Sequence, residues 1–301
     1  MKIYKGLGGI LAALGLSLLW SQPAHAWESY YHDMTISTRV FAALLLTGAA
    51  ATGEAADWRY SVGVHDFNVP DVDSHTYGLN LGISVDRQTA AGRHVFGSAD
   101  VFVDRDHDDL DPDHIPVWWQ VHAGTDGELW KGERTHLGWT AAFDTRVNTV
   151  SSVERQIIAM PAIVAGYATN PLSASVQAST GWFFLEIDDD VPKTRGYGRD
   201  DFRNSELGYS LAADVSLKLG KSWTAFGQAQ EWRDNHDWLQ NEYKVALRME
   251  ASHSHAHSSG FMLSADFHEY NLDVYARPDV SQPILPWNND VMIRLSFDTE
   301  W

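Results

Sequence analysis

The chain has 301 residues and no cysteine, and its formal net charge at pH 7 is −18. This length allows one large β domain or two ordinary domains. The lack of cysteine excludes disulfides, thiolate metal sites and a cysteine nucleophile. The negative charge argues against nucleic acid as a partner and against a basic, anion-selective pore. The count of 13 tryptophans is high, and aromatic belts at a bilayer boundary are one physical reason for such a count.

The start of the chain contains two segments with the features of export signals. Residues 1–26 have a basic start, an apolar run at 7–20 and a small-x-small end, and residues 34–56 repeat the pattern with an apolar run at 40–46. Either run is shorter than the roughly 20 residues of a spanning helix. We expect the second segment to be the natural signal peptide, with the mature chain starting near Asp57. The sequence leaves open which of the two segments is used.

Strand-like alternation recurs through the rest of the chain. In the cleanest run, apolar residues from Tyr77 to Val85 occupy every second position. A period of two means a strand with one apolar and one polar face. Twelve such runs are expected, at 58–65, 77–86, 94–103, 117–122, 136–146, 154–167, 172–185, 207–217, 223–232, 243–250, 261–268 and 291–301. Pro161 should break the sixth run locally, because proline cannot donate to a strand ladder and prefers edges or bulges.

The links between these runs alternate in length. Long loops on one side and short turns on the other are how outer-membrane barrels are built, and an even strand count puts both ends of the barrel on the short-turn, periplasmic side. The long links are 104–114, 187–206 and 271–288, the short ones are 88–92, 169–171 and 220–221, and 124–134 and 252–260 are exceptions.

The charges of the two faces favour a membrane barrel over a soluble one. The apolar face carries almost no charge, as lipid contact requires, whereas the polar face carries both signs. Twelve strands enclose a lumen too wide for side chains to fill as a dry core. We therefore expect an all-β protein with a single transmembrane antiparallel β-barrel at 57–301. A soluble periplasmic β protein is the alternative, in which the apolar faces would pack together.

The inward polar face supplies the candidate lumen residues. They form either a basic ladder opposite acidic groups, which tunes ion selectivity, or an internal network of salt bridges. The predicted lumen-lining residues are Arg146, Asp214, Lys218, Lys244, Arg248, Glu250, Arg294 and Asp298.

The last run resembles the closing strand of bacterial outer-membrane barrels, whose alternation and terminal aromatic residue are read by the barrel-insertion machinery. Its signal residues would be Val291, Ile293, Leu295, Phe297 and Trp301. In size, strand count and ending, the mature chain resembles the solitary, passenger-less kind of autotransporter β-domain and the small twelve-stranded solute channels. The resemblance implies residence in the outer membrane of a Gram-negative bacterium, in contact with membrane lipid and lipopolysaccharide. The chain departs from full autotransporters in lacking a passenger, and from acidic-sugar channels in lacking a basic pore.

A dense acidic segment follows the third run. Alternate carboxylates can converge on a hard cation such as Ca²⁺, although the glycine and final glutamate of an EF-hand loop are missing. The alternatives are a loosely bound divalent cation or a solvated surface loop that is bridged to lipopolysaccharide, and no other cofactor is expected. The aspartates concerned are Asp104, Asp106, Asp108, Asp109, Asp111 and Asp113.

Histidines supply the remaining candidate chemistry. His253, His255 and His257 alternate in an expected periplasmic turn, which either binds a transition metal incidentally or is simply polar. Four more histidines, at 65, 122, 136 and 268, lie within expected strands. A serine nucleophile needs such a base within hydrogen-bond reach, and no spacing singles out a pair. We expect a non-enzymatic barrel for passive solute passage or a structural surface role. The alternative is a lipid-modifying enzyme of the deacylase or phospholipase type.

Overall fold

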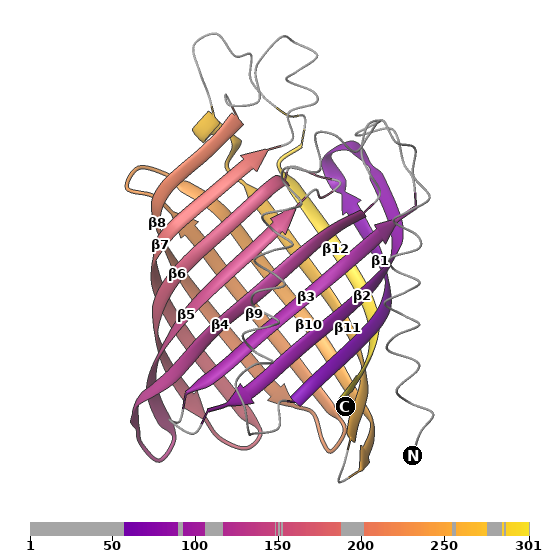
Figure 1. Cartoon of the computed structure of the whole chain (residues 1–301), viewed down its shortest axis with the longest axis vertical. Coiled ribbons are helices and arrows are strands. Elements are labelled where there is room, and N and C mark those ends of the chain that lie inside the picture. Colours follow the sequence, from indigo (N-terminus) through magenta and orange to yellow (C-terminus); the bar gives the residue numbers. More distant parts are fainter. Residues whose placement is uncertain are drawn as a thin grey trace. The chain divides into compact units, whose positions relative to one another are not determined.

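The computed structural model describes residues 57–89, 93–105, 117–147, 149, 151, 153–187, 202–254, 257–275, 285 and 287–300. The two signal-like segments lie outside this part of the chain. Twelve strands form one closed antiparallel barrel in which consecutive strands pair and β12 closes on β1 (Figure 1). The expected twelve-stranded transmembrane antiparallel barrel is therefore confirmed. The strands are β1 (Asp57–Val69), β2 (Ser74–Gln88), β3 (His94–Asp104), β4 (Val117–Lys131), β5 (Thr135–Val147), β6 (Val153–Ala168), β7 (Leu172–Ile187), β8 (Arg203–Lys218), β9 (Trp223–Arg233), β10 (Trp238–Ser254), β11 (His257–Tyr270) and β12 (Asn289–Glu300).

The helical content of the described residues is confined to short turns. They include η2 (Pro70–Val72), between β1 and β2, and η4 (Leu272–Tyr275), after β11. No helix in the described part of the chain is long and apolar enough to cross a bilayer.

The two ends of the barrel differ in their links. At the long-link end, residues 105–116, 188–202 and 271–288 join strands, whereas every link at the short-link end has five residues or fewer. β1 begins and β12 finishes at the short-link end (Figure 1). Two links expected to be long, 124–134 and 252–260, shrink to 132–134 and 255–256, because β4, β10 and β11 extend beyond their apolar runs.

The outward side chains of the strands are apolar. On β2, Leu79 is 60% exposed and Tyr77 is 57% exposed, while Asn80 between Leu79 and Leu81 is buried. On β12, Ile293 and Leu295 are likewise exposed. A continuous exposed apolar belt is what a surrounding bilayer requires. The expected outward orientation is thus confirmed, and packing of these residues in a dry interior is contradicted.

β6 continues through Pro161, and the expected local weakening is confined to the ladder with β7. Pro161 pairs with Ala141 of β5 and is exposed on the outer face. The ladder to β7 omits Pro161 and its neighbour Met160 without a change of register there. Because proline lacks an N–H group, β6 loses pairing on one side only, and a closed barrel has no edge strand on which to place the residue.

The interior of the long-link end is filled by aromatic side chains. Phe102 and Trp118 stack with ring centroids 3.8 Å apart, and η4 adds Tyr275, whose hydroxyl donates to the Leu185 carbonyl at 3.0 Å. Large wall residues and part of the β11–β12 link together occupy this end, a point on which the alternation of the strands is silent. We call this set the plug; its main members are Phe102, Trp118, Phe183, Phe202, Tyr270, Leu272, Tyr275, Leu285 and Trp287, all buried.

The tryptophans lie in two different environments. Trp130, Trp182 and Trp223 are more than two-fifths exposed on the outside of the barrel, whereas Trp118 and Trp287 are buried in the plug. The high tryptophan count therefore reflects both the lipid-facing surface and the packing of the interior.

Candidate functional site: a polar vestibule beneath a closed mouth

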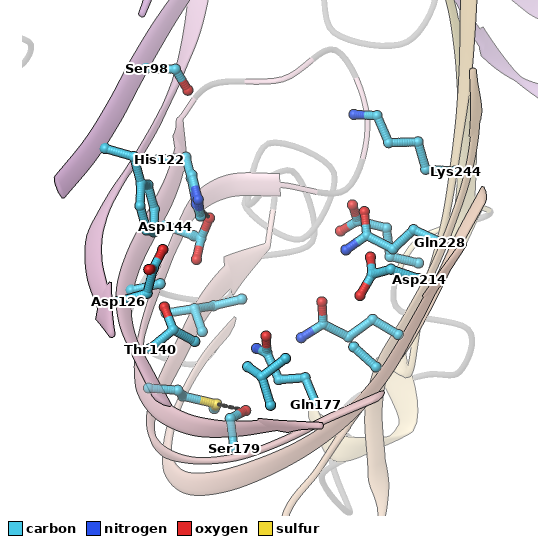
Figure 2. Close-up of a pocket in the computed structure, with 18 of the residues that line it drawn as sticks. Ser98, His122, Asp126, Thr140, Asp144, Gln177, Ser179, Asp214, Gln228 and Lys244 are labelled. Carbon is cyan, nitrogen blue, oxygen red and sulfur yellow. Dashed lines mark hydrogen bonds and ion pairs between the residues drawn. The ribbon is translucent and has the colours of Figure 1, made fainter. Parts of the chain in front are cut away.

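A polar cavity of about 820 Å³ lies inside the barrel. Figure 2 shows Asp144, Gln177, Gln228 and Lys244 pointing into this space from different parts of the wall. Its lining reaches Glu128, close to the β4–β5 turn, so the cavity extends toward the short-link end. The volume falls in the range of about 300–1,000 Å³ that small-molecule pockets occupy. We call this cavity the vestibule.

On the long-link side of the vestibule, side chains of opposite strands meet. β5 and β11 stand six places apart in the ring of twelve strands, and therefore face each other across the lumen. Arg146 of β5 donates to the Tyr270 hydroxyl at 3.0 Å and to His268 Nε2 at 2.9 Å, both on β11. A direct hydrogen bond between facing walls bridges the lumen at this level.

The bridge is anchored by further buried hydrogen bonds. His268 Nδ1 lies 2.7 Å from an Asp290 carboxylate oxygen, and the Ser151 hydroxyl donates to the other oxygen at 2.6 Å. An arginine can only donate, so His268 Nε2 accepts and the ring proton sits on Nδ1, facing Asp290. The side chains of His268 and Asp290 are 4% and 1% exposed. We call the set of Arg146, Ser151, His268, Tyr270 and Asp290 the septum.

A second crossing reinforces the septum. Gln156 of β6 donates to the side-chain carbonyl of Gln240 on β10, four strands away round the ring. Gln156 also stands directly opposite Arg146 in the β5–β6 ladder. The two crossings therefore start from neighbouring points on one wall.

Ion pairs line the part of the wall formed by β10, β11, β12, β1 and β3. Buried and half-buried charges are tolerated there because each lies beside an opposite charge. This arrangement corresponds to the salt-bridge alternative of the sequence analysis. The pairs are Lys244 with Asp266 (3.0 Å), Arg248 with Asp298 (2.8 Å), Arg59 with Asp298 (3.3 Å) and Arg294 with Asp100 (3.5 Å).

The predicted lumen residues are distributed over three places. Arg146 belongs to the septum, and Asp214, Lys244 and Arg294 line the vestibule. Arg248 and Asp298 form their ion pair on the same inner wall. Lys218 and Glu250 are exposed at the short-link ends of β8 and β10.

Asp104 is the one predicted cation ligand within the described residues, and it points into the barrel. Its carboxylate lies 2.6 Å from His65 Nε2 and accepts from Trp118 Nε1 at 2.9 Å. The His65 and Asp104 side chains are 0% exposed. Gly78 makes room for the imidazole, since a Cβ there would lie 2.5 Å from His65 Cε1. Within the described residues, no group of three or more histidine, aspartate or glutamate side chains is placed to hold a metal ion.

The other predicted segments fall partly outside the described residues. The remaining five loop aspartates, His255 and Trp301 lie outside, as do the side chains of His253 and His257, whose backbones belong to the β10–β11 hairpin. The rest of the predicted insertion signal, Val291 to Phe297, forms the outer face of β12, which pairs with both β1 and β11.

Two histidines at or beside the vestibule, His94 and His122, make aspartate contacts that the sequence did not predict. His122 Nδ1 lies 2.5 Å from an Asp144 oxygen, and His94 contacts Asp126 at 2.8 Å and Asp86 at 2.7 Å. His122 and Asp144 stand directly opposite each other on β4 and β5. Only the strand register could have revealed this pairing, because the residues are 22 positions apart in the chain.

Comparisons with known proteins find similar chains among the solved structures. No family model matches the chain, and no curated protein matches it. Similar solved structures include the NanC porin, with a TM-score of 0.44 and 12% identity over 78% of this chain and 98% of that chain. The KdgM porin gives 0.41 and 9% over 79% and 97%, and the translocator domain of the autotransporter NalP from Neisseria meningitidis gives 0.40 and 10% over 92% and 99%.

The chain is an outer-membrane β-barrel. The closed ring of twelve strands and its exposed apolar belt identify this class. The closed ring of twelve antiparallel strands confirms, at the level of the fold alone, the predicted resemblance to autotransporter-like and porin-like barrels.

Proposed function

We propose that this barrel is a non-enzymatic, gated passage for small polar solutes. The vestibule extends toward the short-link end, which barrel topology assigns to the periplasm. The septum and the plug close the lumen toward the opposite end. The observation that carries the proposal is the pair of hydrogen bonds from Arg146 across the lumen to Tyr270 and His268. Passage requires these bonds to break and the plug to move.

The lipid-modifying alternative receives less support from the histidines. A nucleophilic hydroxyl needs a base within hydrogen-bond reach. Ser151 donates to Asp290 rather than to a histidine, and His268 is engaged by Arg146. Among the described residues, His122 bonds to Asp144 and to no serine hydroxyl. These contacts favour structural and electrostatic roles for the histidines.

Planar-bilayer recording of the purified protein tests the proposal. We expect long closed periods with brief, discrete openings, because the resting lumen is bridged, and we expect no fatty-acid release from phospholipid vesicles that contain the protein. A steady open conductance would contradict a closed resting state. Fatty-acid release would support the enzyme. An absence of conductance in both the natural chain and a variant without the septum would leave only a structural role.

A further inference from the structure

The two sides of the vestibule differ in chemistry. The part formed by β6 to β9 presents amides and hydroxyls, and Asp214 is its one charged residue among the described lining residues. We call this part the amide wall; its polar members are Gln156, Gln177, Ser179, Ser210, Gln228 and Gln230.

Part of the amide wall is held in place by its own hydrogen bonds. The Ser179 and Ser210 hydroxyls lie 2.6 Å apart, and Gln230 donates to Ser210 at 3.0 Å. Gln177 and Gln228, by contrast, point into the open space from different parts of the wall (Figure 2). At the end of the wall nearer the long links, Trp232 Nε1 is buried with no acceptor among the described residues. A buried donor without an acceptor costs free energy unless an acceptor moves close.

These groups match a ligand rich in hydroxyls. A primary amide offers two donors and an accepting oxygen, and a hydroxyl both donates and accepts. Neighbouring hydroxyls of a sugar ring present the same mixture. An amide wall can therefore bond a polyhydroxylated solute without having to neutralise a charge.

The charges that line the vestibule disfavour an anionic solute. Six carboxylates line it against three lysine or arginine side chains. All three cationic groups are already engaged, Arg146 in the septum, Lys244 with Asp266 and Arg294 with Asp100. A carboxylate on the solute would meet mainly negative groups. Water screens charges less effectively inside a barrel than in bulk solution, which strengthens that repulsion. The six acidic residues are Asp100, Asp126, Glu128, Asp144, Asp214 and Glu242.

We propose that the amide wall binds a polyhydroxylated solute that carries no negative charge, with Gln177 and Gln228 making the main contacts. The assignment rests on the proposed role of the vestibule as the entrance for solutes. Glucose and glucuronate are suitable probes, because they share a ring and differ by one carboxylate.

Isothermal titration calorimetry of the detergent-purified full chain tests the assignment. We expect glucose to bind with a Kd in the millimolar range, as a few hydrogen bonds in a wet site allow, and at least about fivefold more tightly than glucuronate. Gln228→Leu and Gln177→Leu should each weaken glucose binding by about two- to tenfold, the cost of losing one or two hydrogen bonds. Gln88→Leu, which changes an exposed glutamine at the short-link end of β2, is the matched control and should leave binding unchanged.

Equal or tighter binding of glucuronate would overturn the assignment, as would an absence of binding heat with glucose at about 100 mM, far above a millimolar Kd. An equal loss in Gln88→Leu and Gln228→Leu would also overturn it. Heat-modifiable migration confirms that each variant is folded. Binding in micelles does not depend on the opening of the septum. Glucose binding without conductance would therefore contradict the gated passage and still support solute binding at the amide wall.

Discussion

A variant that loses the Arg146 bridge and the link residues of the plug is expected to conduct ions continuously. In this variant a short turn replaces residues 272–287, which carry four plug residues, and Arg146→Ala removes both hydrogen bonds across the septum. Its time-averaged conductance in a planar bilayer should exceed that of the natural chain by about tenfold or more, because pore conduction depends on an unobstructed polar path. Arg146→Ala alone should lengthen the openings less than the combined variant does, since the plug remains.

The matched control keeps the shortened link and replaces a different lumen arginine. Arg248→Ala removes a guanidinium that pairs with Asp298 two strands away and that makes no hydrogen bond or ion pair with the opposite wall among the described residues. The time-averaged conductance of this control should be closer to that of the natural chain than the conductance of the variant with Arg146→Ala is. Equal conductance in the Arg146→Ala and Arg248→Ala variants would show that loss of the link, or of any lumen charge, is enough to open the barrel. The septum would then have no role in closing it.

Asp104→Ala is expected to cause a large loss of stability in the barrel. Asp104 accepts from both His65 and Trp118, and its side chain is 0% exposed. Removing one partner of a buried pair leaves the other group buried and unpaired, which costs about 3–5 kcal/mol. Urea unfolding of the barrel in lipid vesicles measures the change in free energy of unfolding.

An exposed pair of the same residue types on the outside of β1 and β2 provides the control. Asp66 lies 3.3 Å from His75, and their side chains are 27% and 40% exposed. Since exposed ion pairs contribute about 0–1 kcal/mol, Asp66→Ala should change the free energy of unfolding by no more than that. Similar losses for Asp66→Ala and Asp104→Ala would mean that burial of the His65–Asp104 contact contributes nothing.

The sequence predicts the strands and their two faces because both follow from local alternation. The run from Val291 to Phe297 shows its outward face without knowledge of any partner strand. Strand ends are less predictable: β4 continues to Lys131 through Gly124, Asp126 and Glu128, where no apolar alternation remains. Near the short-link end a strand can leave the bilayer, and an apolar face is then no longer required.

The candidate site depends on contacts that local alternation does not contain. Arg146 and Tyr270 are 124 positions apart and meet only because the barrel closes. Asp104 is a different case, since it shares the alternation of Asp100 and Phe102, both of which face inward on β3. That spacing was a usable signal for an inward aspartate, and the acidic run that follows it in the sequence obscured it.

Single cysteines can map the two faces directly, because the chain has no cysteine of its own. The decisive measurement is sided thiol labelling of Gln228→Cys, in the vestibule, and Leu211→Cys, 62% exposed on the outer face. A water-soluble maleimide should react with Gln228→Cys from the short-link side only, whereas Leu211→Cys should react only with a lipid-soluble maleimide. Reaction of Leu211→Cys with the water-soluble reagent, or of Gln228→Cys from both sides, would contradict a lipid-facing apolar belt around a polar lumen closed at one end.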